Sequence, residues 1–490
     1  MDKNYLKLSE AFDRYYILQK IHSNLSWDTQ VKMPKNGFYI REKQLTLIND
    51  EISNTICNKN IAELFATIKQ ENLPLKAQRN FALMQKIFLH QNAIPPKLKQ
   101  EFALMALKTE FIWPQAKQAN DFALFNKYFS KLIFLLREIT QIKSEKMHIS
   151  KYETLLDLYS PAIKEAELDI VFANLAHKLP SLIAKISSKQ NIAPNLAKLK
   201  APKIAQTKLI KKITKKLRLN HSWCRIDESL HPFCTGFSGD VRITTKYDAT
   251  NFTSALMGII HEAGHALYDN NLPKATSTQP IGQAAGMALH ESQSLFFEMQ
   301  IARSKPFCEF IINDVNKCLN IDLSVTELYT CLNFVEKQHI RIASDEVTYP
   351  LHIILRYQIE KDLINNKIET TDIPEIWSTK TEKLLQLKTP NHQLGCLQDI
   401  HWSDGSLGYF PSYSLGAIYA SQISEKMKIY LPNFDELIAT GKFQAIHKIL
   451  KEEIHAKAHS KDAAEIMSNF TGKNLAVDDY LNYLEKKFLN

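Results

Sequence analysis

The chain has 490 residues, of which 45% are hydrophobic and 23% charged, and its formal net charge is +9. This length and apolar content allow a large buried core and exclude intrinsic disorder as a description of the whole chain. The charge excess lies in residues 194–220, which carry nine basic side chains and no acidic one. Leu209, Ile213 and Leu217 recur there at helical spacing. We interpret this segment as a helix with a solvated lysine face, which argues against a nucleic-acid partner.

Membrane and secreted proteins are also disfavoured. The most apolar run, Leu132–Leu136, has five residues, whereas roughly 20 are needed to span a bilayer. Residues 1–16 are charged throughout and lack the apolar core of a signal peptide. Seven cysteines, an odd number in a long chain, are typical of reduced thiols. We therefore predict a cytoplasmic protein without a membrane partner.

The first half of the chain has the pattern of helices. Leu132 and Leu136 fall on one helical face, and the apolar positions after Glu165 repeat with the same period up to Pro180, where we predict that a helix ends. The next distinct element is residues 239–245, where β-branched side chains alternate between two faces after an entry glycine. The sequence therefore predicts a mostly α fold with a small β-sheet element.

Glycine is unevenly distributed along the chain. The first 235 residues contain only Gly37, whereas residues 236–416 contain ten of the 13 glycines. Glycine permits tight turns and close approach of the backbone to a ligand. We predict a single domain over residues 1–490, with a helical scaffold (1–230), an active-site half (231–416) and C-terminal helices (417–490).

The segment His261-Glu262-Ala263-Gly264-His265 follows an apolar run and is predicted to lie on a buried helix. Side chains at i and i+4 share one face of a helix, about 6 Å apart. Two imidazoles at that spacing can bind one zinc ion at Zn–N distances of about 2.0–2.1 Å. Glu262 is placed to polarise a water molecule beside them. The pattern predicts a metal site with a general base.

A third ligand is expected, because catalytic zinc commonly has three protein ligands and an open position. Residues 268–271 are Tyr-Asp-Asn-Asn, so the HExxHxxGxxH pattern is absent. Glu291 lies in another predicted buried helix, where a carboxylate without a partner would be costly. We predict Glu291 as the third ligand. Glu298, on the same helical face, is the alternative ligand, or else an outer ion-paired group.

Glu291 stands within His290-Glu291-Ser292-Gln293-Ser294, and this segment resembles the second motif of the carboxypeptidase Taq family of zinc metallocarboxypeptidases. Further segments are similar to that family's motifs and occur in the same order along most of the chain. They are Trp27-Asp28 with Met33-Pro34, His231-Pro232-Phe233, Asp240-Val241-Arg242-Ile243-Thr244, Ile340-Arg341-Ile342-Ala343-Ser344-Asp345-Glu346, Gln398-Asp399-Ile400-His401-Trp402 and Gly408-Tyr409-Phe410-Pro411-Ser412-Tyr413.

The resemblance implies a large helical single domain with a deep central cleft and a small sheet near the active site. It implies His261, His265 and Glu291 as zinc ligands and Glu262 as general base and proton shuttle. It further implies Arg341 as the residue that binds the substrate's C-terminal carboxylate, a role that bidentate guanidinium–carboxylate geometry supports.

The remaining site residues also follow from the resemblance. Tyr409 or Tyr413 is expected to donate a hydrogen bond to the oxyanion. His231 and His401 are expected to line the cleft. The strand Asp240–Thr244, with Asp240 and Arg242, is expected to bind substrate by pairing with its backbone.

Plainer interpretations exist for several of these residues. Arg341 can simply pair with Asp345, four residues on, and the two tyrosines can be packing aromatics. A structural zinc site is suggested by two His–Cys pairs, His221-x-x-Cys224 and His231-x-x-Cys234. We disfavour that site, because its pieces are His–Cys pairs and the second overlaps another motif.

We therefore predict a zinc-dependent metallocarboxypeptidase that releases single amino acids from peptide C-termini with broad specificity. One Zn²⁺ per chain is expected, with Co²⁺ or Mn²⁺ as substitutes. The family resemblance implies a homodimer. The alternatives are a zinc oligopeptidase or endopeptidase of similar architecture, and a basic nucleic-acid-associated protein with a vestigial site.

Overall fold

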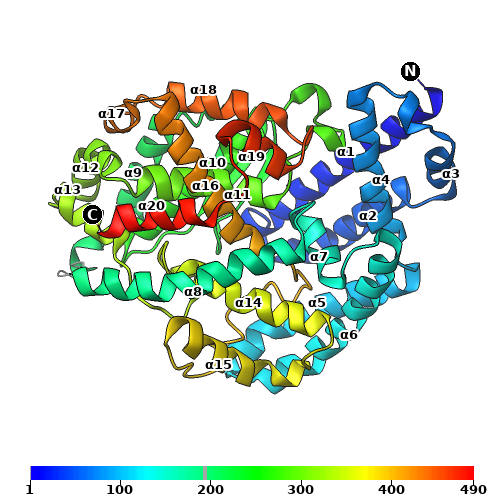
Figure 1. Ribbon diagram of the computed structural model, residues 1–490, viewed down its shortest axis with the longest axis horizontal. Helices are drawn as coiled ribbons and strands as arrows, with labels where there is room; N and C mark the ends of the chain where they lie inside the picture. The colour runs from blue at the N-terminus through cyan, green and yellow to red at the C-terminus, as the bar shows by residue number, and fades with distance from the viewer. Residues whose placement is uncertain (1, 191–195, 490) are drawn as a thin grey trace. The chain divides into compact units, whose positions relative to one another are not determined.

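The computed structural model of the chain describes residues 2–190 and 196–489 (Figure 1). The chain divides into two compact units, each built from three separate stretches of sequence. The first unit comprises Met1–Gln91, Pro194–Leu332 and Tyr419–Leu475; the second comprises Asn92–Ala193, Asn333–Ile418 and Ala476–Asn490.

The first unit contains a three-stranded sheet and many helices. Its elements are α1 (Lys3–Val31), α2 (Phe38–Ile56), α3 (Lys59–Thr67), α4 (Leu75–Asn92), α9 (Lys203–Lys216), β1 (Cys224–Glu228), β2 (Cys234–Phe237), β3 (Asp240–Thr245), α10 (Phe252–Asn271), α11 (Met287–Leu295), α12 (Lys305–Leu319), α13 (Val325–Asn333), α17 (Phe434–Ala439), α18 (Gln444–Glu453) and α19 (Ala463–Thr471). A π-helical turn, Phe296–Ala302, continues α11.

The second unit contains helices and connecting loops, with no strand among its described residues. Its elements are α5 (Pro96–Ala119), α6 (Phe122–Met147), α7 (Lys151–Tyr159), α8 (Glu165–Lys189), α14 (Tyr349–Ile364), α15 (Ile373–Leu385) and α20 (Val477–Leu489). Helix α16 (Pro411–Tyr430) begins in this unit and ends in the first. The mostly α fold with one small sheet is thus confirmed, whereas a single domain over residues 1–490 stays a prediction.

The sheet has the order β1-β3-β2, with β1 parallel and β2 antiparallel to β3. Val241 and Ile243 of β3 are fully buried, and β3 packs against α10. Alternate side chains of a strand point to opposite faces, so one face of β3 supplies apolar contacts to the helix. The sheet therefore supports the helix that carries the HEAGH segment.

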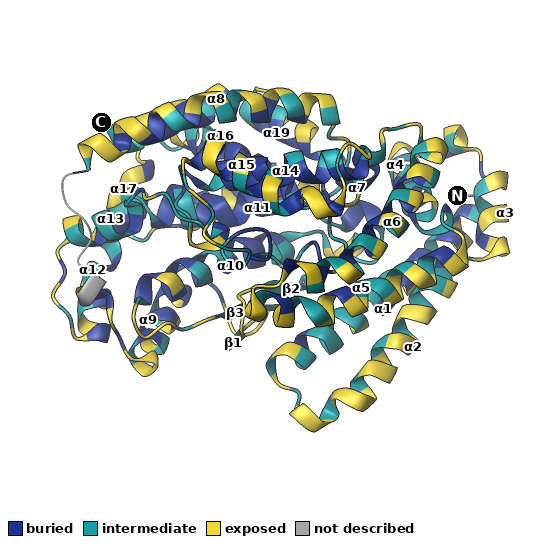
Figure 2. Cartoon of the chain, turned by 90° about the horizontal axis from the view of Figure 1, so that it is seen from below, coloured by how far each residue is buried: buried dark blue, intermediate teal, exposed yellow. Residues whose placement is uncertain are grey.

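Burial differs strongly from one helix to another, and the helix that carries the HEAGH segment is among the most buried. Helix α10 in the first unit and α14 in the second are dark over most of their length in Figure 2, whereas α2 is largely exposed, with Ile56 its only buried residue. Asn251 precedes the first residue of α10, and its side chain accepts a hydrogen bond from the backbone N–H of Thr253 and so caps the helix.

Helices α10 and α11 approach each other closely at Gly264. A Cβ atom at this position would lie 2.4 Å from the carbonyl oxygen of Gln293 and 2.6 Å from the Cα atom of Ser294. Both atoms belong to backbone, which cannot move aside as a flexible side chain can. A residue without a side chain is therefore required between the two histidines of the HEAGH segment.

We expect Gly264→Ala to lower the free energy of unfolding by about 1–3 kcal/mol, the range typical of overpacked cores. Gly258→Ala, on the same helix, is the matched control, because its Cβ would meet Pro232 at an ordinary 3.8 Å. Urea unfolding of the metal-free proteins measures both effects. Equal stabilities for the two variants would contradict the close helix approach.

One sequence-based boundary is wrong. Helix α8 does not end before Pro180 but continues to Lys189. Leu175, Leu179 and Ile183 form one buried stripe on both sides of the proline. Packing of this stripe outweighs the hydrogen bond that proline removes, which costs about 3 kcal/mol in a helix interior.

Other predictions from composition agree with the structure. The lysine-rich segment forms α9, in which Leu209, Ile213 and the adjoining Leu217 are buried while Lys208 and Lys211 are exposed. No disulfide bond joins any of the seven cysteines. None of the helices in the described part of the chain combines the length and the apolar character needed to cross a bilayer.

Candidate metal and substrate site

His261, His265 and Glu291 converge within the first unit, on α10 and α11. One ligand atom from each lies within 4.8 Å of the other two. Glu291 Oε1 is 3.8 Å from His261 Nε2, and Glu291 Oε2 is 3.4 Å from His265 Nε2. Burial alone would raise the pKa of Glu291, but the two histidines outweigh it and lower that pKa. Two imidazole nitrogens and an ionised carboxylate form a donor set that suits a divalent metal ion.

Glu262 lies beside this cluster and is buried. Its Oε2 atom has no hydrogen-bond partner among the described residues. Burial raises the pKa of Glu262 to about 7, with His261 opposing the rise and Glu291 adding to it. A carboxyl group with a pKa near neutrality can accept a proton and return it.

Glu298 contacts the outer side of His261. Its Oε2 lies 3.0 Å from His261 Nδ1, the ring nitrogen opposite the one nearest Glu291, and its Oε1 accepts a hydrogen bond of 2.6 Å from Arg303. Burial would raise the pKa of Glu298, but Arg303 and His261 lower it to about 2. The geometry favours an outer carboxylate that orients His261 over the alternative of a metal ligand.

We expect Glu298→Gln to weaken metal binding by about 10- to 100-fold, the usual effect of removing such an outer carboxylate. An amide placed between Arg303 and His261 cannot accept a hydrogen bond on both sides. Chelator competition measures the affinity. Glu327→Gln, which disturbs an exposed pair with Lys198 and the contacts with Ser324, should bind metal as the wild type does. Equal affinity in both variants would show that Glu298 does not orient the ligand.

His290 packs against His265 and is itself held by Asp269. The rings of His290 and His265 stack with centroids 4.4 Å apart, and Asp269 Oδ1 lies 2.9 Å from His290 Nε2. The second Asp269 oxygen accepts a contact of 3.7 Å from the thiol of Cys234 on β2. These contacts fix the ring plane of His265, one of the predicted metal ligands.

Arg341 lies in the second unit, in a one-turn 3-10 helix, and is buried. Its Nε donates to Asp399 Oδ1 at 2.9 Å and its Nη1 donates to the Tyr349 hydroxyl at 2.7 Å. Arg356 donates from Nε to the other Asp399 oxygen at 2.7 Å. Burial would raise the pKa of Asp399, but Arg341 and Arg356 hold that pKa well below its usual range. One carboxylate is thus shared between two buried guanidinium groups.

The alternative pairing of Arg341 with Asp345 is not formed. Asp345 instead accepts hydrogen bonds from the Thr348 hydroxyl and from backbone N–H groups that include that of Val347. The sequence predicts no role for Asp399, which lies 58 residues from Arg341. The signal that could have found it is the need of a buried guanidinium for an acidic partner.

Several aromatic side chains surround the guanidinium of Arg341. The Cζ atom lies 5.1 Å from the ring centroid of Tyr413 and 5.3 Å from that of Phe410. His401 packs on Phe410 with centroids 4.6 Å apart, and Tyr409 lies 5.3 Å from Tyr413. The structure therefore brings Arg341, His401, Tyr409 and Tyr413 together in one unit.

Backbone pairing between substrate and the strand Asp240–Thr244 is ruled out. This strand is β3, the middle strand of the sheet, so β1 and β2 occupy both of its edges. Arg242 pairs with Asp240 through two N–H groups, at 3.0 and 2.9 Å, and lies 4.6 Å from the ring centroid of Trp27. His231 is exposed at the approach to β2. Roles for Asp240, Arg242 and His231 in substrate binding stay predictions.

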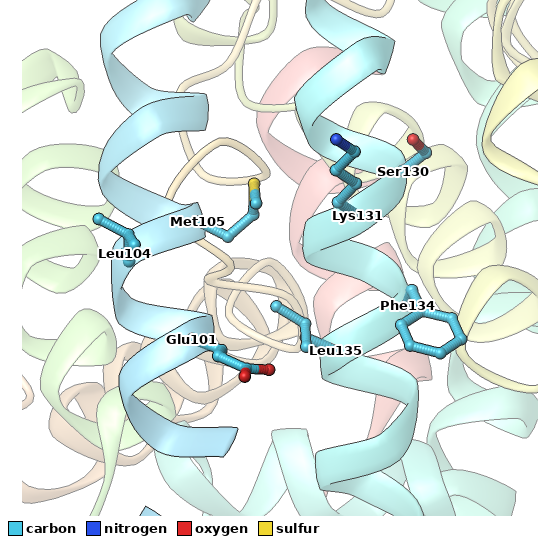
Figure 3. A pocket seen from close by; sticks show the side chains of 7 residues that line it. All are labelled: Glu101, Leu104, Met105, Ser130, Lys131, Phe134 and Leu135. Atoms are coloured by element: carbon cyan, nitrogen blue, oxygen red, sulfur yellow. The ribbon is translucent and has the colours of Figure 1, made fainter. Parts of the chain in front are cut away.

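The structural zinc site disfavoured above, between residues 221 and 234, finds no support in the structure. Among the described residues, His261, His265 and Glu291 make the one group of three that could hold a metal ion. A groove of about 400 Å³ between α5 and α6 contains none of the predicted site residues; it is lined by Glu101, Leu104, Met105, Ser130, Lys131, Phe134 and Leu135 (Figure 3).

Comparison with known proteins identifies the family. Residues 7–488 match the model of the carboxypeptidase Taq (M32) metallopeptidases. The chain belongs to that family. Carboxypeptidase 1 of Bacillus subtilis is 33% identical to this M32 chain over 473 residues, which cover 95% of the chain and 94% of that protein.

Two further relatives match over nearly their whole length. Thermostable carboxypeptidase 1 of Pyrococcus furiosus is 29% identical over 488 residues, covering 98% of this M32 chain and 97% of that protein. The structure of metallocarboxypeptidase 1 of Trypanosoma cruzi has a TM-score of 0.96 and 32% identity, and each chain is covered to 100%.

Family membership confirms the resemblance seen in the motifs. This M32 chain is a metallocarboxypeptidase, a hydrolase acting on peptide bonds. The family implies a divalent metal, and the His261, His265 and Glu291 donor set fits one. The endopeptidase and nucleic-acid alternatives are not favoured.

Proposed function

We propose that the chain is a zinc-dependent carboxypeptidase that releases single amino acids, with broad specificity, from peptides with a free C-terminus. The observation that carries this proposal is the convergence of His261, His265 and Glu291 with the buried carboxyl of Glu262 beside them. Two nitrogen ligands and one carboxylate would hold a divalent ion and leave room beside it for water or substrate.

Each residue of this group has a distinct role in hydrolysis. His261, His265 and Glu291 hold the metal, which when bound supplies Lewis-acid polarisation of the peptide carbonyl and acidifies water. Glu262 takes the proton from the attacking water and delivers it to the leaving amine. Glu298 keeps His261 in the orientation for binding.

Arg341 is proposed to bind the substrate's C-terminal carboxylate. A guanidinium has five N–H groups. One on Nε and one on Nη1 have partners, and Nη2 lies 2.9 Å from Asp399 Oδ1. One N–H on each of the two Nη atoms therefore remains for the carboxylate of the substrate. Two N–H groups of one guanidinium can bind both oxygens of a carboxylate in bidentate fashion.

The edge strand β2 is proposed to pair with the substrate backbone in place of β3. Phe233 faces β3, because its carbonyl accepts from Thr244 N–H, and Thr235 pairs with Arg242. Alternate residues of an antiparallel strand point their backbone groups in opposite directions. The N–H and C=O of Cys234 therefore face away from β3 and suit an extended peptide.

The other roles are part of the same proposal. Tyr409 or Tyr413 stabilises the oxyanion, and His231 and His401 line the substrate site with Asp240 and Arg242 nearby on β3. The working metal is zinc, with cobalt or manganese as substitutes. A cytoplasmic location and a homodimer remain predictions.

One set of peptides tests this function. We expect the metal-loaded protein to release the last residue of a free-acid peptide, and we expect a C-terminal amide to lower kcat/KM by about 100-fold or more, because a charge-assisted bidentate contact is lost. Mass spectrometry identifies the products. Internal cleavage, or indifference to the amide, would favour the oligopeptidase alternative.

The same set tests the β2 contact. N-methylation of the backbone amide that precedes the scissile bond removes one donor, and we expect kcat/KM to fall by about tenfold, the effect of losing one buried hydrogen bond. An unchanged value would remove β2 from the proposal without affecting the metal site.

A further inference from the structure

Glu360 is a fully buried carboxylate about one turn before the end of α14, outside the groups described so far. Its Oε2 accepts hydrogen bonds from the Tyr152 hydroxyl at 2.8 Å and from the Gly408 backbone N–H at 2.9 Å. Its Oε1 accepts one from the indole N–H of Trp402 at 2.8 Å. Three hydrogen bonds from three places in the chain therefore meet on one side chain.

Two of these donors mark the ends of one loop, residues 402–408. Gly408 has a φ of +88°, a conformation that favours glycine. A Cβ atom there would lie 2.8 Å from a backbone carbon of Leu155 on α7. The loop is thus fixed at both ends by α14 and pressed against α7 at its second end.

The residues on either side of this loop belong to the group that surrounds Arg341. Asp399, which accepts hydrogen bonds from Arg341 and Arg356, lies three residues before Trp402. Tyr409 directly follows Gly408 and packs on Tyr159 of α7 with centroids 5.0 Å apart. The placement of Asp399 and Tyr409 therefore depends on where the two ends of the loop are held.

The surroundings of Glu360 require an acceptor on both of its oxygens. Trp402 and Gly408 can only donate through their N–H groups, and they contact different oxygens. A glutamine would turn its NH₂ group towards one of these two donors, whichever way its amide lies. Burial raises the pKa of Glu360 to about 7, and the three donors oppose that rise because their hydrogen bonds favour the ionised carboxylate.

We propose that Glu360 is a positioning residue of the carboxylate-binding site. By fixing both ends of residues 402–408, it holds Asp399, and through Asp399 the guanidinium of Arg341, in the orientation that binds the substrate's C-terminal carboxylate. This inference rests on the proposed function, in which Arg341 binds that carboxylate. Glu360 itself touches neither substrate nor metal in this role.

Three variants of the full-length, metal-loaded enzyme test the proposal. Glu360→Gln places a donor against a donor, and Tyr152→Phe removes only the hydrogen bond from α7. Tyr357→Phe is the matched control: it removes a hydrogen bond of 2.7 Å to Asp169 from the same helix, away from the loop. Each variant is assayed with the free-acid peptide, and amide exchange at Gly408 is followed by hydrogen–deuterium exchange.

We expect Glu360→Gln to raise KM by about tenfold or more, because a buried donor loses its acceptor, with kcat within about threefold of wild type. Tyr152→Phe should raise KM by about threefold. Amide exchange at Gly408 should become about tenfold faster in Glu360→Gln. Tyr357→Phe should leave KM and this exchange unchanged.

Other outcomes overturn the proposal. Wild-type KM in both Glu360→Gln and Tyr152→Phe would do so, and so would an equal KM increase in Tyr357→Phe, which would indicate general destabilisation. If Glu360→Gln does not fold, Tyr152→Phe against Tyr357→Phe decides. A wild-type enzyme indifferent to the C-terminal amide would instead refute the proposed function, and Gly408 exchange would still report whether Glu360 fixes the loop.

Discussion

Replacing Glu262 by glutamine is expected to lower kcat by about 10³- to 10⁴-fold, at the upper end of what general acid–base catalysis contributes. The amide has nearly the shape of the carboxyl group but cannot take a proton from water or return one to the leaving amine. Glu262 does not belong to the cluster of three convergent ligand atoms. The variant should therefore bind metal as the wild type does.

Metal content separates this outcome from a loss of the site. Elemental analysis of the Glu262→Gln protein should give wild-type stoichiometry, whereas Glu291→Gln, which alters a ligand, should bind metal more weakly. A metal-loaded Glu262→Gln enzyme that keeps more than about a tenth of wild-type turnover would rule out Glu262 as the general base.

The second large effect is expected at Asp399. The side chains of Arg341 and Arg356 are 6% and 1% exposed and share this carboxylate. Asp399→Asn leaves two buried guanidinium groups without a counter-ion, and breaking a buried ion pair in this way costs about 3–5 kcal/mol. We expect a loss of that size in the free energy of unfolding, together with a large rise in KM for free-acid peptides.

The pH for this measurement follows from the pKa. Because the folded-state pKa of Asp399 lies below its ordinary value of 3.8, its stabilising contribution is complete above that value and is lost as the pH falls further. Urea unfolding at pH 7 therefore captures the whole effect. Asp404→Asn is the control, since Asp404 is exposed and accepts a hydrogen bond from its neighbour Ser406. A similar loss in both variants would contradict the ion-pair argument.

The metal site could be predicted from sequence because its geometry is local. The i, i+4 spacing of His261 and His265 depends only on helix periodicity. Glu291 followed from the cost of a buried carboxylate and from the family resemblance. The fold class could be predicted for the same reason, since helical periodicity is visible in short windows of sequence.

What could not be predicted depends on contacts between distant parts of the chain. Asp345 is four residues from Arg341 and was the obvious partner, yet Asp399, 58 residues away, bonds with Arg341. The strand at Asp240 was recognised, but its place in the middle of the sheet depends on two other strands. Pro180 was expected to end a helix because its local cost is known, whereas the packing that offsets this cost is tertiary.

The two units are built from alternating segments of the chain, and this order has a consequence for biosynthesis. All three predicted metal ligands precede residue 292, but the first unit is completed only by Tyr419–Leu475. His455 of that last stretch bonds with Asn271 of α10 and with Gln293 of α11. A ribosome must therefore release nearly the entire polypeptide before that unit can close. We expect truncated nascent chains to lack a stable metal centre, so that the enzyme acquires its metal at the end of synthesis.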